Sequence, residues 1–164
     1  MPVGRGSWNL KCLREDWQKK EDAYNRFMVL LLAGTSEVGR NAIATKIVKD
    51  WEQWRHLPVE QLAEIEMLSE ANPEGDESLL VRIACHCAKE MNEEGFHLLI
   101  SMPFMDNAHD IAKEELGEDI VAVHLGPMDH LAHSDFPHRI NTDEHSVTDT
   151  IALLAALLPS KPAA

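Results

Sequence analysis

The sequence is short of cysteine, of aromatic residues and of long apolar runs. The three cysteines among the 164 residues are Cys12, Cys85 and Cys87. An odd, small number of thiols argues against a disulfide framework and fits a reducing compartment. The longest apolar run, residues 27–33, is too short to cross a bilayer, and no apolar stretch follows the basic residues near the N-terminus as it would in a secretory signal. We therefore expect a cytoplasmic protein with no membrane segment.

Positive charge is also scarce. The chain has 15 Lys and Arg against 28 Asp and Glu, so its formal net charge is -13. Such a field repels phosphate at a distance, which disfavours nonspecific binding to nucleic acid or to an anionic membrane. A single nucleotide is not excluded, because a local nest of backbone N–H groups can outweigh distant charge. With 45% apolar residues in this length, the composition predicts one packed domain.

The chain divides into three parts by composition. Residues 1–26 are polar and charged, and we predict an N-terminal helical extension with a helix around residues 11–25 that packs on the edge of the domain. Residues 27–158 carry the regular apolar patterns and form the predicted domain. Residues 159–164 are rich in Pro and Ala and are predicted to be a flexible tail.

Within the domain, strand and helix patterns alternate about five times. Apolar runs predict strands at residues 27–33, 96–101 and 119–125, with a weaker second strand within 58–68. Residues 138–141 are predicted to form a short last strand. Apolar spacing of three and four predicts helices at residues 40–55, 76–94, 106–116 and 146–158. This order predicts an α/β fold of three layers, with a parallel sheet of about five strands and helices on both faces. Such sheets bind ligands at the carboxyl ends of their strands.

The first predicted strand leads into a glycine-bounded segment, Gly34 to Asn41, which we expect to be a turn as far as Gly39. Its spacing matches G-x-x-x-x-G-K-[ST], between a strand and a helix as that phosphate-binding motif requires. In such a loop, backbone N–H groups hold phosphate oxygens, the lysine reaches the β and γ phosphates, and the hydroxyl ligates magnesium. The segment predicts a P-loop fold. The residues assigned to nucleotide binding are Gly34, Thr35, Ser36, Glu37, Val38, Gly39, Arg40 and Asn41.

The reacting positions of this motif are altered. Arg40 replaces the lysine; it stays charged but is longer and forked. Asn41 replaces the Ser or Thr and is a poorer magnesium ligand. Glu37 adds a negative charge to a loop that should attract phosphate. The motif therefore identifies the fold better than it identifies an activity.

The chain resembles the adenylylsulfate kinase family over about residues 27–158. Gly34-Thr-Ser36 with Gly39 is similar to the family's phosphate loop. The helix that contains Arg82, with the following strand ending in Ser101, resembles the R-R-I-x-x-V-A-K helix and the I-S-P strand of the family. Residues 106–116 and 140–158 are similar to its next helix and to its I-D-T…S-V-E-E ending.

The resemblance implies a P-loop kinase fold, ATP or ADP with magnesium as the cofactor, and adenylyl sulfate as the acceptor. It implies a substrate site that includes Arg82, Ser101 and Pro103. Three family features are absent from the sequence: the lysine, serine and threonine of the loop, the D-G-D-x-x-R motif after the second strand, and a long basic lid. The lid is reduced to residues 126–137. Because closure of a lid excludes water and completes such a site, we expect impaired catalysis.

Two further groups of residues have competing interpretations. Asp106, His109 and Asp110 follow the third predicted strand, residues 96–101, and one of them could act as a general base. They equally fit the exposed first turn of a helix, where acids favour the dipole. We take Arg40 and Asp106 as the candidate catalytic residues.

The second group is a histidine-rich segment, residues 124–138, which could form a zinc or nickel site. We prefer a solvated loop, because nothing fixes the ligand geometry. Cys85 and Cys87 stand two apart in a predicted helix and do not share a face, so we expect no metal site there either.

Three functions remain open from the sequence. The preferred one is a catalytically impaired adenylylsulfate kinase-like protein that acts as a nucleotide-binding or regulatory module, with a second copy or another protein as a partner. The second is an active ATP-dependent phosphotransferase that uses Arg40 on a small-molecule acceptor. The third is a structural subunit on a P-loop scaffold, since fold does not fix function.

Overall fold

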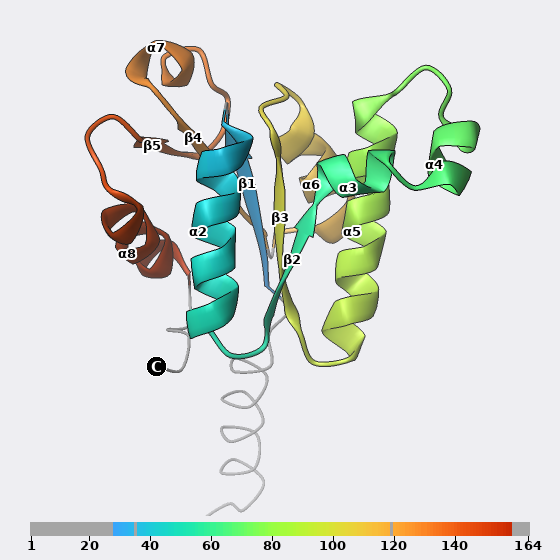
Figure 1. Cartoon of the computed structure of the whole chain (residues 1–164), viewed down its shortest axis with the longest axis horizontal. Helices are drawn as coiled ribbons and strands as arrows, with labels where there is room; N and C mark the ends of the chain where they lie inside the picture. The colour runs from blue at the N-terminus through green and yellow to red at the C-terminus, as the bar shows by residue number, and fades with distance from the viewer. Residues whose placement is uncertain (1–27, 35, 119, 159–164) are drawn as a thin grey trace, which may run out of the picture.

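A five-stranded parallel sheet lies at the centre of the domain (Figure 1). The computed structural model describes residues 28–34, 36–118 and 120–158. The strand order is β2-β3-β1-β4-β5, and every pair of neighbours is parallel. The strands are β1 (Val29–Gly34), β2 (Trp54–Pro58), β3 (His97–Pro103), β4 (Ile120–Gly126) and β5 (His138–Asn141). The predicted sheet is confirmed.

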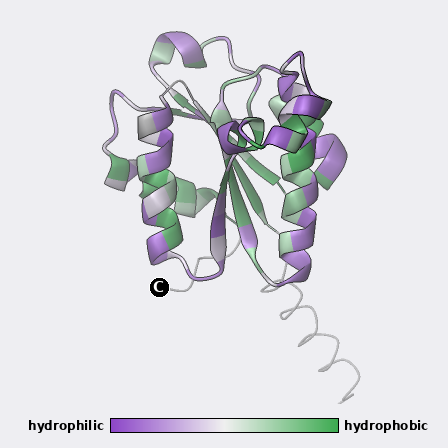
Figure 2. Ribbon diagram, turned by 45° about the vertical axis from the view of Figure 1, so that its right-hand side comes forward, coloured by the Kyte–Doolittle hydropathy of each residue, from purple (hydrophilic) through white to green (hydrophobic). Residues whose placement is uncertain are grey.

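Helices cover both faces of the sheet, which confirms the predicted three layers. One apolar cluster joins the sheet to α3, α5 and α6, and a second joins the opposite face to α2 and α8. Figure 2 shows the apolar residues concentrated on the strands and on the sides of the helices that face them. The helices are α2 (Glu37–Asp50), α3 (Val59–Ala63), α4 (Glu66–Ala71), α5 (Glu77–Glu93), α6 (Ala108–Leu116), α7 (Met128–Leu131) and α8 (Val147–Leu157).

The central strand β1 explains the shape of both clusters. All six of its residues are buried, and alternate side chains point to opposite faces: Leu31 belongs to the α5 side, and Leu32 to the α2 side. In the sheet register, Gly34 lies opposite Pro103 of β3 and Leu125 of β4. The carboxyl ends of three strands therefore meet beside Gly34.

Two predictions about the segment after the first strand are wrong. The first helix ends at Asp50, and a turn in which Gln53 has a φ of 68° leads into β2, which lies before residues 58–68. Trp51 and Trp54 are spaced as on a helix, but they flank this turn and pack edge to face at 5.7 Å. Residues 58–68 contain α3 and the start of α4; two of their three glutamates, Glu64 and Glu66, are exposed there, and Glu60 is partly buried.

The remaining helices lie close to their predicted positions. Ser146 begins α8 with a capping box to Asp149, as the sequence indicated. The predicted loop of residues 126–137 contains the four-residue helix α7. None of the described helices combines the length and the apolar content needed to cross a bilayer. The predicted N-terminal extension and C-terminal tail lie outside the described residues.

Candidate functional site

The turn between β1 and α2 is shorter than the motif predicts. The helix begins at Glu37, before Gly39, so the predicted turn as far as Gly39 is wrong. Ser36 is the N-cap: its Oγ accepts a hydrogen bond from Gly39 N at 3.2 Å, and its carbonyl accepts one from Arg40 N at 3.0 Å. A phosphate cradle needs such backbone N–H groups to face the ligand. Here the N–H groups of Gly39 and Arg40 are used within the helix itself.

The guanidinium of Arg40 is turned inward. Its side chain is 3% exposed; Nη1 donates to the carbonyl of Gly34 at 2.5 Å, and Nη2 makes an ion pair with Glu60 Oε1 on α3. Its Nε is buried and has no hydrogen-bond partner among the described residues. Arg40 therefore ties β1 and α2 to α3, and two of its three nitrogens are engaged by the protein.

A second polar pair lies on the neighbouring strands. His56 of β2 and Ser101 of β3 share a hydrogen bond of 2.7 Å between Nε2 and Oγ, and Ser101 is fully buried. Burial lowers the pKa of His56, and the negative charge of Glu60 opposes that shift. Arg40, Glu60, His56 and Ser101 thus follow one another across the carboxyl ends of β1, β2 and β3.

A cavity of about 280 Å³ opens beside this turn. It lies between the first turn of α2, the end of β4 and the start of α8. Its volume is near the lower end of the range of small-molecule sites, roughly 300–1,000 Å³. The residues that line it are Gly34, Ser36, Gly39, Arg40, Ile43, Leu125, Thr142, His145, Val147 and Thr150.

Two other predicted loop residues, Glu37 and Asn41, do not line this cavity. Asn41, at the magnesium-ligating position, lines a separate hollow along α2 with Thr45 and Lys46. Glu37 is exposed in the first turn of α2. Thr35 and the side chain of Val38 lie outside the described part of the chain. Within the described residues, the standard lysine, magnesium and phosphate positions are therefore not brought together around one space.

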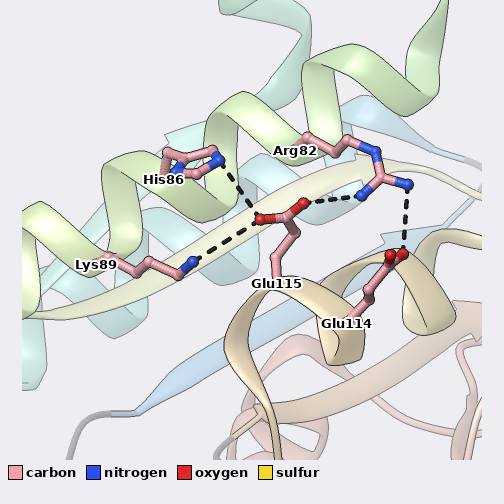
Figure 3. A network of polar contacts seen from close by, with 5 residues as sticks. All are labelled: Arg82, His86, Lys89, Glu114 and Glu115. Atoms are coloured by element: carbon pink, nitrogen blue, oxygen red, sulfur yellow. Dashed lines mark hydrogen bonds and ion pairs between the residues drawn. The ribbon is translucent and has the colours of Figure 1, made fainter.

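The predicted substrate residues separate into two places. Pro103 ends β3 opposite Gly34 and is exposed, and Ser101 lies two residues earlier, beneath it. Arg82 lies instead on the outer side of α5, where its Nη1 contacts Glu115 Oε1 at 2.8 Å and its Nη2 contacts Glu114 Oε2 at 3.4 Å (Figure 3). The structure does not bring Arg82 to the cavity.

The Arg82 network joins α5 to α6. Figure 3 shows Arg82, His86 and Lys89 from α5 gathered around Glu115, whose Oε2 lies 3.4 Å from His86 Nε2 and 3.8 Å from Lys89 Nζ. The hydrogen bond from Arg82 is the largest influence that lowers the pKa of Glu115. These contacts hold two helices together over the sheet, which gives Arg82 a structural explanation.

An aromatic cluster with a buried histidine lies at the end of β4. The ring of His124 is fully buried and stacks on Phe104, with ring centroids 3.9 Å apart and planes 5° apart. Phe136 packs against both rings. Neither ring nitrogen of His124 has a hydrogen-bond partner among the described residues. The sequence predicts His124 in a strand, but it does not predict that its ring nitrogens lack hydrogen-bond partners among the described residues. That property depends on how Phe104 and Phe136 pack around the ring.

Burial is the main cause that lowers the pKa of His124. The positive charges of His130 and Arg139 lower it further, and the carboxylates of Asp135 and Asp106 raise it. Asp106, the candidate base, is exposed in the loop before α6. Within the described ranges, no three His, Cys, Asp or Glu side chains are grouped so that they could hold a metal ion.

These histidines should make stability depend on pH. The pKa values of His56, His97 and His124 are lowered from 6.5 in the folded state, so protons bind better to the unfolded chain. The contribution of these neutral histidines to the free energy of unfolding is therefore complete above pH 6.5 and is lost as the pH falls below it. We expect His124→Phe to flatten this loss, by up to about 1.4 kcal/mol per pH unit. Urea unfolding at pH 7.5, 6.5 and 5.5 measures it, and equal slopes in both proteins would contradict the prediction.

No protein-family model matches the sequence, and no curated protein sequence matches it. Solved structures do match. The tunicamycin resistance protein of Deinococcus radiodurans superposes with a TM-score of 0.64 at 14% identity, over 80% of this chain and 95% of that one. The five-stranded parallel sheet with helices around it matches the P-loop kinase fold of this neighbour. The chain has the P-loop kinase fold.

Two other proteins with the P-loop kinase fold are similar at lower TM-scores. The APS kinase of Mycobacterium tuberculosis, in a complex with AMPPNP and APS, matches with a TM-score of 0.57 at 17% identity, over 82% of this chain and 99% of that one. A sugar kinase from Janibacter matches with a TM-score of 0.57 at 10% identity, over 82% and 99%. At these identities the likeness extends to the fold and not to the substrate.

Proposed function

We propose that this protein is a nucleotide-binding, adenylylsulfate kinase-like module in which phosphoryl transfer is impaired and which acts by binding or regulation. The observation that carries the proposal is the position of Arg40. It holds the place of the catalytic lysine in the sequence, but it donates to Gly34 and pairs with Glu60. A phosphate that enters the cavity would meet the Arg40 guanidinium, whose charge is already paired with the carboxylate of Glu60.

Competition for Arg40 weakens phosphate binding. To bind a phosphate as a lysine does, Arg40 would have to leave Glu60 and the carbonyl of Gly34. Breaking a buried ion pair by removing one partner typically costs about 3–5 kcal/mol. A phosphate would have to offset much of this cost before it gained any net affinity. Binding in the millimolar range is the reasonable expectation, which corresponds to about 4 kcal/mol.

Among the described residues, none is placed to ligate magnesium at the position that the motif predicts. Asn41 follows Arg40 on α2 and lines a different hollow from the cavity. Phosphoryl transfer depends on a metal ion that bridges the β and γ oxygens and neutralises the developing charge. We infer that any nucleotide binding here depends little on magnesium and that turnover is slow or absent.

Some features still favour an anion at this place. The Arg40 Nε is a buried donor that finds no partner among the described residues, and Arg40 lines the cavity. A buried unpaired donor costs about 1–3 kcal/mol, and an acceptor group from a ligand would recover part of that. The first turn of α2 also borders the same space, where the helix dipole favours negative charge.

Thermal melting tests the binding part of the proposal. The full chain is heated alone, with millimolar magnesium-ATP or magnesium-ADP, and with ATP in excess EDTA. We expect a small rise in Tm that EDTA leaves unchanged; a ligand at five times its Kd stabilises by about 1 kcal/mol. The matched control is Asn41→Ala, which should respond as the parent does. No shift with any nucleotide would contradict nucleotide binding.

A turnover assay tests impairment separately. ATP hydrolysis and transfer to adenylyl sulfate are measured with the same protein preparation. We expect no transfer above background. Rates on the order of 1 s⁻¹ or faster, typical of kinases, would overturn the proposal in favour of the second candidate, an active phosphotransferase. Absence of both binding and turnover would favour the third, a structural subunit.

A further inference from the structure

An open groove of about 820 Å³ follows the free edge of β5, between α7 and α8. β5 is the last strand of the described sheet, so no strand from residues 28–34, 36–118 or 120–158 lies beside its outer edge. Apolar side chains from both helices and from the strand form most of the walls. The residues that line the groove are Met128, Leu131, Ala132, Pro137, His138, Arg139, Ile140, Asn141, Glu144, His145, Leu153, Ala156 and Leu157.

Two large apolar side chains of this groove are exposed. Met128 on α7 is 56% exposed and Leu153 on α8 is 40% exposed. An open strand edge next to exposed apolar residues is a surface that proteins usually cover, because it invites pairing with another chain. The chain that covers it should have apolar side chains and a complementary charge.

The charge around the groove favours a basic occupant. The segment that builds it, residues 128–157, contains five Asp and Glu but one Arg and no Lys. Residues 28–164 as a whole contain nine Lys and Arg and 24 Asp and Glu, a net charge of -15. Two such domains repel each other at low salt. A second copy of the domain is therefore a poor candidate for this surface.

The N-terminal segment of the same chain has the complementary properties. Residues 1–27 contain six Lys and Arg and four Asp and Glu, a net charge of +2. Leu10, Leu13, Trp17 and Tyr24 recur at spacings of three, four and seven, which would place them on one face of the predicted helix. We propose that residues 1–27 dock in the β5–α8 groove through this apolar face.

The segment is long enough to reach the groove. It joins the domain at Met28, directly before β1, and β5 is two strands away from β1 in the sheet. Strands lie about 4.8 Å apart, so the lateral distance is about 10 Å. A segment of 27 residues spans about 40 Å even when it is entirely helical. The docked segment would cover Met128 and Leu153 and bring its basic residues to the segment 128–157, in which acidic residues outnumber basic ones.

A spin label on a native cysteine tests this docking. Cys12 lies within the segment, and burial raises the pKa of the Cys85 thiol to about 12, which makes Cys85 slow to react. A nitroxide is attached to Cys12 in the full chain with Cys87→Ser, and methyl signals are recorded by NMR. We expect loss of most of the intensity at Met128 and Leu153. The methyl of Met67, 71% exposed on α4 across the sheet, is the control and should stay sharp.

Variants on both sides complete the test. Leu153→Asp in the groove and Trp17→Ala in the segment should each restore the Met128 signal. Broadening of the Met67 signal, or the absence of broadening at both Met128 and Leu153, would overturn the proposal. A mixture of labelled protein and isotope-enriched unlabelled protein detects contact between copies: broadening there would also overturn it, in favour of a dimer. The docking does not rest on nucleotide binding, so the two proposals fail independently.

Discussion

Arg40→Ala is expected to lower the free energy of unfolding by about 3–5 kcal/mol with no nucleotide present. The substitution removes the partner of Glu60, which is 27% exposed, and a hydrogen bond to the carbonyl of Gly34. It also leaves space where a buried side chain stood. For a domain of this size, each kcal/mol lowers Tm by roughly 2–4 °C. The melting temperature and urea denaturation of the variant measure the effect.

The size of this loss separates two roles for Arg40. A cation held ready for a phosphate contributes little to the stability of the empty protein, and surface substitutions usually change stability by less than about 0.5 kcal/mol. Lys49→Ala, an exposed basic residue in the last turn of the same helix, is the matched control. If Arg40→Ala were as mild as Lys49→Ala, Arg40 would not be held by Glu60 in solution.

Gly34→Ala is expected to cost about 1–3 kcal/mol, because it overpacks the end of two strands. A Cβ at residue 34 would lie 2.8 Å from the backbone oxygen of Leu125 and 3.3 Å from its Cβ. The nearest obstacle is backbone in a paired strand, so β1 and β4 must move apart at their carboxyl ends. Urea denaturation measures the cost, and hydrogen exchange at Leu125 and Gly126 should accelerate.

The second glycine of the motif provides the comparison. A Cβ at Gly39 would meet Ser36 Oγ at 3.5 Å and Ser36 Cβ at 3.7 Å, both ordinary contacts. Gly39 lies within α2, where alanine is favoured over glycine by about 0.5–1 kcal/mol. Gly39→Ala should therefore stabilise the protein. Destabilisation by Gly39→Ala would mean that the loop in solution adopts a backbone that only glycine tolerates there.

Much of the fold could be predicted from apolar patterns alone. The run before Gly34 is apolar at every position, which is typical of a strand buried on both faces, and β1 is such a strand. The segment after Asp50 could not be predicted in this way. Trp51 and Trp54 continue the helical spacing of α2, and only the turn at Gln53 separates them. A single residue with positive φ does not interrupt the apolar spacing of the sequence, so this spacing did not predict the end of the helix.

Less of the candidate site than of the fold could be predicted from the sequence. The sequence identified the segment from Gly34 to Asn41 and the altered residue Arg40. It gave no indication that Arg40 pairs with Glu60, because the two are 20 residues apart and meet only when α3 folds over the end of β1. Correct placement of the second strand would have pointed to Glu60, since that residue follows Pro58 at the carboxyl end of β2. The direction of a long side chain depends on such neighbours and not on the motif.

The pairing of Arg40 with Glu60 also bears on how this chain can change over generations. The charge that a phosphate site needs is still encoded in the chain, and a carboxylate on another helix holds it. A codon for glutamate becomes one for glutamine through one nucleotide change, which would remove the carboxylate charge and keep a similar shape. A single mutation at residue 60 thus separates a cavity wall whose positive charge is paired from one whose positive charge is unpaired. A lineage that carries this pair can therefore gain a stronger phosphate site through one substitution.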